Sequence, residues 1–113
     1  MASSIQISNE LISASESGDV DYVKRFELDA LRNWRSDEFG SSALVIAAAV
    51  DTTSSVCAEI LERCPSLLCK PNKNGITALH AAAVNDNPEV IKFLLSASVA
   101  SGQCYKLLIM KKA

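Results

Sequence analysis

The sequence lacks the features that would place it in a membrane, on a nucleic acid or in a secretory pathway. No segment approaches the run of about 18 apolar residues that is needed to span a bilayer. Eleven basic residues stand against 13 acidic ones without a sustained run of either sign, so no basic stripe for nucleic acid is present. Residues 1–19 have no basic start followed by an apolar run, so no secretory signal is predicted. At 113 residues, we expect one soluble domain with no membrane insertion by this segment.

The sequence is also poor in residues that carry catalysis. His80 is the single histidine, so no histidine relay is possible. The four glycines, Gly18, Gly40, Gly75 and Gly102, are isolated from one another, which excludes a glycine-rich phosphate loop. No G-x-S-x-G motif is present. We therefore predict that the chain is not an enzyme and binds no cofactor.

Four cysteines, Cys57, Cys64, Cys69 and Cys104, occur without a C-x-x-C pair. Zinc would have only His80 as an additional ligand of the preferred kinds. Cys57 and Cys64 fall on the apolar side of a predicted helix, where free cysteine acts as a small hydrophobic residue. We expect reduced, structural cysteines and a cytoplasmic location. A redox or metal function of the four thiols remains an alternative.

What the sequence does contain is a repeat of about 34 residues. The stretch from Gly40 to Ala49 returns, at an offset of 35, from Gly75 to Val84. The quartet Val56, Cys57, Ile60 and Leu61 returns as Val90, Ile91, Leu94 and Leu95 at an offset of 34. This spacing places four apolar side chains on one helical face. A weaker copy includes Leu11, Ala14, Tyr22, Val23 and Phe26. Three copies predict stacked helix pairs that share one continuous core.

Each unit divides into a turn, a short helix and a bulkier helix. Glycine-containing turns are predicted at 36–41 and 72–76, because tight turns often need a positive φ. Alanine-rich helices are predicted at 43–50 and 78–85, and second helices at 55–63 and 88–96. Residues 96–103 are small and polar and predict an enlarged loop. Glu59, Glu62, Arg63, Glu89 and Lys92 are expected to face solvent.

The phrase Thr77, Ala78, Leu79, His80, Ala81, Ala82 resembles the T-P-L-H-x-A phrase of the ankyrin repeat. Departures are Ala78 in place of proline, and Asp86 and Ser98 in place of glycine. The resemblance implies an all-α ankyrin-repeat solenoid of about three helix-turn-helix units, with short hairpin-like turns and an incomplete C-terminal end. Structural roles are predicted for Gly40 and Gly75 in the turns, for Leu44 and Leu79 in the core by their periodicity, and for Thr77 at a helix start. The resemblance implies that His80 hydrogen-bonds to backbone near the adjoining turns.

The same resemblance divides the single module of residues 1–113. Residues 9–35 resemble an N-terminal capping repeat, 36–70 a divergent repeat and 71–103 the best-matching repeat. Residues 104–113 are expected to begin a further, incomplete repeat. The run from Glu59 to Leu68 is similar in style to plant ankyrin proteins that carry a membrane-spanning portion after the repeats. Any such tether would lie beyond Ala113.

The resemblance implies a non-catalytic protein-binding module with its partner on the concave surface of turns and first helices. The corresponding residues are Trp34, Arg35, Glu38, Phe39, Ser41, Ala49, Val50, Lys73, Asn74, Ile76, Val84 and Asn85. Aromatic and arginine side chains are favoured anchors of interfaces. Alternatively, Trp34 and Phe39 pack against the neighbouring turn. A second hypothesis is a regulatory or self-associating fragment of a longer protein, which docks through the apolar run from Leu107 to Met110.

Overall fold

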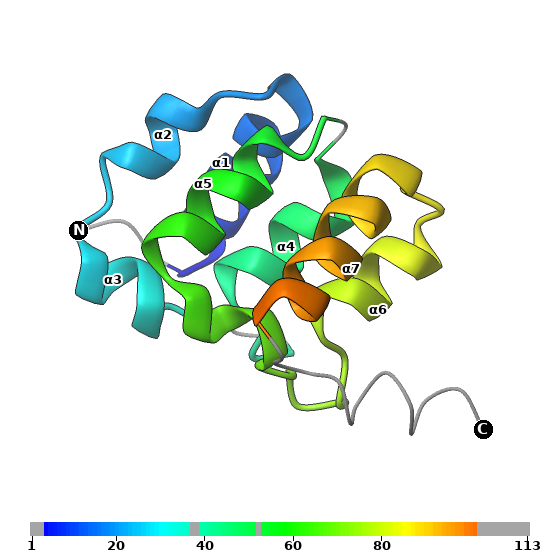
Figure 1. Ribbon diagram of the computed structural model, residues 1–113. Coiled ribbons are helices and arrows are strands. Elements are labelled where there is room, and N and C mark those ends of the chain that lie inside the picture. The colour runs from blue at the N-terminus through cyan, green and yellow to red at the C-terminus, as the bar shows by residue number, and fades with distance from the viewer. Residues whose placement is uncertain (1–3, 37–38, 52, 102–113) are drawn as a thin grey trace.

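The computed structural model describes residues 4–36, 39–51 and 53–101, and all regular elements in this part are helices (Figure 1). In chain order they are α1 (Ser4–Ser17), α2 (Val20–Lys24), α3 (Leu28–Asn33), α4 (Ala43–Val50), α5 (Ser55–Arg63), the 3₁₀ helix η1 (Pro65–Cys69), α6 (Ala78–Val84) and α7 (Pro88–Ser101). The predicted all-α class is confirmed. The predicted bounds 43–50 and 55–63 are those observed, and the helix predicted at 78–85 ends one residue earlier.

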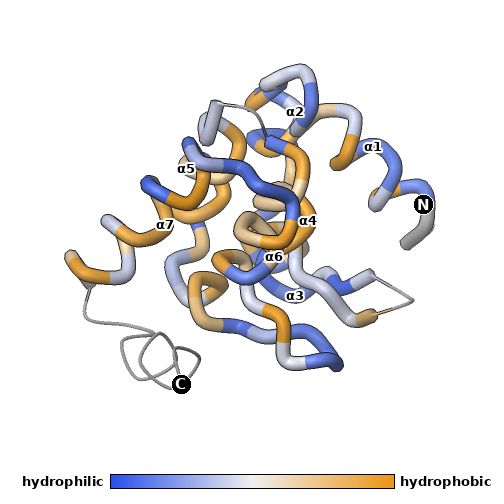
Figure 2. The backbone as a smooth tube through the Cα atoms, turned by 90° about the vertical axis from the view of Figure 1, so that its right-hand side faces the viewer, coloured by the Kyte–Doolittle hydropathy of each residue, from blue (hydrophilic) through white to orange (hydrophobic). Residues whose placement is uncertain are grey.

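Helix α4 is the centre of the stack, because it packs against α1 on one side and against α6 on the other. Its Ala47 and Ala48 are completely buried, as is Ala82 of α6. Side chains this small allow neighbouring helices to approach closely, and Figure 2 shows α4 and α6 as largely hydrophobic segments. The outer helices complete each pair: α2 and α4 pack against α5, and α6 packs against α7.

The predicted continuous core is present. Leu44 is fully buried within a single cluster that runs from Leu11 in α1 to Leu94 in α7. Leu79 is partly buried and packs against the same cluster. Two repeats that are 35 residues apart therefore share one core, which is the arrangement that stacked helix pairs require.

Two expectations about the last helix are wrong. Residues 96–101 are helical, because no glycine or proline interrupts the run of small residues before Gly102. The inward-facing Ser98 is 3% exposed, so this part of α7 also packs against the body of the protein. Leu95, predicted to be core, is 40% exposed, whereas its neighbour Leu94 is fully buried.

Arg63 does not face solvent as predicted. Its guanidinium donates hydrogen bonds to the backbone oxygens of Val23 at 2.7 Å and Phe26 at 2.5 Å. Val23 belongs to the last turn of α2, where backbone oxygens lack partners within the helix, and Phe26 follows two residues after its end. Arg63 thus fastens the first helix pair to the second. The short helix α3, which the sequence pattern did not predict, follows directly after this contact.

Asn87 makes the corresponding link between the second and third pairs. Its side-chain amide donates to the backbone oxygen of Ala48 at 3.3 Å and also to that of Asp51. The Asp51 carboxylate is completely buried and accepts the backbone amides of Thr53 at 3.2 Å and Cys57 at 3.0 Å. One buried polar cluster therefore connects the end of α4, the start of α5 and the loop before α7.

Replacing Asn87 with alanine should destabilise the fold by about 1–3 kcal/mol, because two carbonyl oxygens of the preceding repeat lose their donor. Asn85→Ala is the matched control, since the Asn85 amide donates only within its own helix, to Ala81, and its side chain is exposed. Urea unfolding followed by circular dichroism measures both free energies. Equal losses in the two variants would contradict a special role for Asn87.

Candidate protein-binding surface

The first turn of the surface closes through backbone hydrogen bonds at Ser36. The Ser36 amide donates to the Ser41 oxygen at 2.9 Å, and the Gly40 amide donates to the Ser36 oxygen at 3.1 Å. Gly40 has a φ of +65°, a conformation that side chains with a Cβ resist. A Cβ at this position would also lie 3.2 Å from Cγ of Lys73, whose stem crosses the turn. The positive φ therefore favours glycine here, whereas the close approach is one that the exposed Lys73 side chain can relieve by a small shift.

The second turn is organised by Asn72. Its backbone amide donates to the Ile76 oxygen at 2.9 Å, while its side-chain oxygen accepts the amides of Asn74 at 2.9 Å and Ile76 at 3.0 Å. Gly75 supplies the positive φ of +78°. A side chain that bonds the backbone two residues further on is a common way to stabilise a turn.

The two turns are joined to each other as well as closed on themselves. The Lys73 amide donates to the Phe39 oxygen at 2.9 Å, and the Asn72 side chain donates to Ser41 Oγ at 3.2 Å. Adjacent turn tips are thereby held in fixed register. A partner would meet a preformed surface, which reduces the entropy lost on binding.

The helices behind the turns begin at hydroxyl residues, as predicted for Thr77. Ser42 Oγ accepts the Val45 amide at 3.4 Å at the start of α4. At the start of α6, His80 Nδ1 accepts the Thr77 amide at 3.1 Å and lies 2.9 Å from Thr77 Oγ1, which completes a capping box. The predicted hydrogen bond of His80 to backbone is confirmed. This role is structural, because the ring nitrogen is committed to the helix start.

The predicted contact residues differ in how accessible they are. Phe39 is 47% exposed and Val84 is 80% exposed, and both are large apolar side chains in water. Lys73, Asn74 and Asn85 are exposed, and Ala49 and Val50 are half-exposed. Glu38 lies outside the described residues. These residues lie in the turns and in or next to α4 and α6, which pack against each other.

Other predicted contact residues are largely structural. Ser41 is 5% exposed and accepts the Asn72 hydrogen bond, so it is unavailable to a partner. Ile76 and Trp34 pack against the core cluster, although the buried Trp34 indole nitrogen has no hydrogen-bond partner among the described residues. The Arg35 guanidinium donates to the backbone oxygens of Arg32 at 2.8 Å and Trp34 at 2.7 Å. Arg35 therefore closes the end of α3.

The described cysteines differ in burial and bonding. Cys57 and Cys64 are free and buried, as predicted, and among the described residues no group of three potential metal ligands is found. Cys69 is disulfide-bonded, so the expectation of four reduced cysteines is wrong at this position. Cys104 lies outside the described residues.

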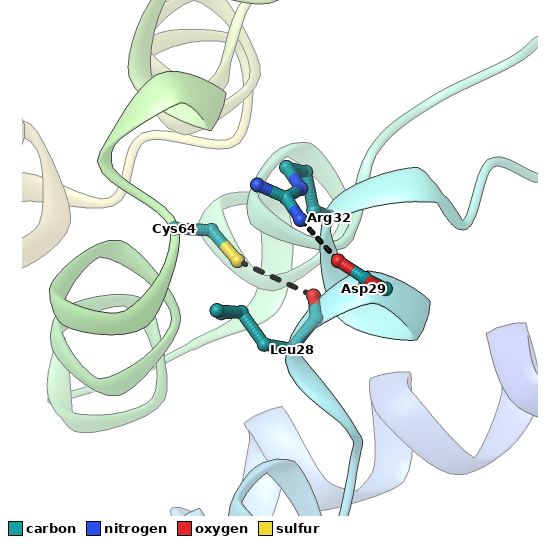
Figure 3. Close-up of polar contacts among 4 residues, drawn as sticks. All are labelled: Leu28, Asp29, Arg32 and Cys64. Carbon is teal, nitrogen blue, oxygen red and sulfur yellow. Dashed lines mark hydrogen bonds and ion pairs between the residues drawn. The ribbon is translucent and has the colours of Figure 1, made fainter.

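Cys64 lies at the junction between α3 and the end of α5. Its thiol points toward the Leu28 backbone oxygen at 4.0 Å, next to the ion pair of Arg32 with Asp29 (Figure 3). Burial raises the pKa of the Cys64 thiol, and the positive charges of Arg32 and Arg63 partly oppose that rise. The group therefore remains a neutral thiol near pH 7, unlike the thiolate of a reactive cysteine.

The pKa of Cys57 is also raised, first by burial and then by the nearby Asp51 carboxylate. The pKa in the folded state exceeds the ordinary value of 9.0. The neutral thiol therefore contributes fully to the free energy of unfolding below about pH 9, and this contribution declines at higher pH.

Between about pH 9 and pH 10, the free energy of unfolding should fall more steeply in wild type than in Cys57→Ala, by at most about 1.4 kcal/mol per pH unit. Urea titrations across this range measure both slopes. Equal slopes in wild type and Cys57→Ala would contradict the raised pKa of Cys57.

The geometry as a whole defines a repeat solenoid, in which successive helix pairs stack and their turns project side by side. A family model described as ankyrin repeats (3 copies) matches residues 11–111. The chain therefore belongs to the ankyrin-repeat family. A comparison with curated proteins found no match. No helix in the described ranges has the length and apolar character needed to cross a membrane.

Proposed function

We propose that this chain is a non-catalytic protein-binding module, whose partner contacts the turn tips and the accessible sides of α4 and α6. Ankyrin repeats are generally protein–protein interaction modules, which supports the class of function. The exposure of Phe39 and Val84 supports the location, because large apolar side chains in water are typical of interaction surfaces. The alternative of self-association through the run from Leu107 to Met110 falls outside the described residues.

The proposed surface has an apolar middle. Helices α4 and α6 contain no Asp, Glu, Lys or Arg. A helix of eight residues is about 12 Å long, so Phe39 before α4 and Val84 at the end of α6 lie near opposite ends of this surface. A partner that contacts both would cross the two helices and cover the half-exposed Ile46, Ala49 and Val50 between them.

The double substitution Phe39→Ser with Val84→Ser should weaken partner binding at least tenfold, because losing about 1.4 kcal/mol of apolar burial has this effect. The melting temperature should change little, since both side chains are largely outside the core. Wild-type chain on a resin would first capture partners from a lysate of the source cell, and calorimetry would then measure the affinity of each captured partner for the variants.

The matched control is Val99→Ser on α7, where a valine is 72% exposed on a helix that is not part of the proposed surface. It should leave affinity unchanged. A partner that binds the double variant as tightly as wild type would contradict the proposed surface, as would a partner that Val99→Ser weakens equally.

A further inference from the structure

A second surface lies at the other end of the stack, between α1 and α2. Two adjoining hollows there share Glu10, Tyr22 and Arg25 in their walls. One hollow is completed by the apolar side chains of Ile7 and Phe26, and the other by Ser13, Ala14, Ser17 and Asp19. We call the two together the α1–α2 groove. Figure 1 shows α1 and α2 at the opposite end of the molecule from α6 and α7, so this groove is separate from the surface described above.

The groove is held open by contacts that do not require a ligand. The Tyr22 hydroxyl donates to Glu10 Oε1 at 2.9 Å and thereby links the two helices. The Tyr22 ring meets the Phe26 ring edge to face, with centroids 5.3 Å apart. Burial and the Glu10 carboxylate raise the pKa of Tyr22, so the phenol stays a donor at neutral pH. The apolar floor and its polar wall are therefore preformed.

The charge around the groove is predominantly negative. Residues 4–30 carry six acids, Glu10, Glu16, Asp19, Asp21, Glu27 and Asp29, against the two bases Lys24 and Arg25, a net charge of −4. Arg32, which forms an ion pair with Asp29, and Arg63, whose guanidinium bonds the backbone oxygens of Val23 and Phe26, also lie at this end and reduce the net charge to −2. The field at this end of the stack therefore attracts cations. Glu10 and Asp19 bring two of the carboxylates to the groove itself.

We propose that the α1–α2 groove binds a basic segment of a partner protein, which places one bulky apolar side chain against Ile7 and Phe26. A lysine or arginine of that segment lies beside Glu10 and Asp19. Charge complementarity supports this occupant, and the apolar floor distinguishes the groove from a merely acidic surface. Arg25 also lines the groove, and within the described residues its guanidinium has no hydrogen bond or ion pair. It repels a basic ligand, so removing its charge strengthens binding.

Two labelled peptides of equal length test the proposal by fluorescence anisotropy: an amphipathic helix of leucine and lysine, and the same helix with glutamate in place of lysine. The leucine–lysine peptide should bind, and the leucine–glutamate peptide should not. Glu10→Gln should weaken binding about two- to fivefold, the effect of losing one exposed ion pair. The glutamine side-chain oxygen still accepts the Tyr22 hydrogen bond, which preserves the groove. Arg25→Gln should strengthen binding by a similar factor.

Glu89→Gln is the matched control, because it removes the same charge from an exposed position on α7. It should leave the affinity unchanged, whereas Ile7→Ala should lower it through the apolar floor. Amide chemical-shift changes on adding the leucine–lysine peptide should centre on Ile7, Tyr22 and Phe26. Equal binding of both peptides, weaker binding by Arg25→Gln, or shifts confined to α4 and α6 would overturn the proposal.

Discussion

The structure depends on the close packing of α4 between two neighbouring helices. Ala47 and Ala48 of α4 and Ala82 of α6 are completely buried, and larger side chains at these positions would separate the helices. Overpacking a close contact of this kind typically costs about 1–3 kcal/mol. The distance between helices also sets the distance between turns, because each turn leads directly into one of these helices. The alanines thus fix the spacing of the turns in the proposed binding surface.

Polar side chains then set the register that apolar packing leaves open. Apolar contact is non-directional, so helices packed through alanine alone could slide past each other. Arg63 holds the backbone oxygens at the end of α2, and Asn87 holds those at the end of α4. Each of these side chains connects one helix pair to the preceding pair at a fixed position along the helices. Removing either donor takes a hydrogen-bond partner from two carbonyl oxygens, although the Val23 oxygen keeps the Phe26 amide at 3.1 Å.

The sequence predicted those parts of the fold that repeat. The bounds of α4 and α5 follow from the apolar spacing, and the turn glycines follow from the positive φ that Gly40 and Gly75 adopt. Helix α3 was missed because its six residues show no repeated counterpart, and its position depends on the contact of Arg63 with the end of α2. The extension of α7 was missed because serine and alanine are compatible with both helix and loop.

The sequence predicted only some features of the candidate surfaces, because contacts between distant residues leave no repeating pattern. Exposure of Phe39 and Val84 follows from their place in the repeat, but burial of Ser41 depends on Asn72, which lies 31 residues away. The Tyr22 to Glu10 bond joins two helices 12 residues apart in the sequence. Neither contact has a periodic signature. An asparagine before a turn glycine, or a tyrosine and a glutamate in different helices, occurs in many sequences. Only the folded structure shows that these residues contact each other.

The two proposed surfaces on one stack favour two independent partners rather than one switch. The surface over α4 and α6 has an uncharged middle, whereas the α1–α2 groove is surrounded by acids, so the same ligand chemistry does not suit both. Coupling between them requires a ligand that distinguishes two arrangements of the intervening packing. Among the described helices, α1 packs directly against α4, and α2 reaches α4 through α5. Leu11 of α1 and Leu44 of α4 are both buried in the core. A tightly packed core resists small graded movements. Occupation of one surface should therefore leave the affinity of the other unchanged.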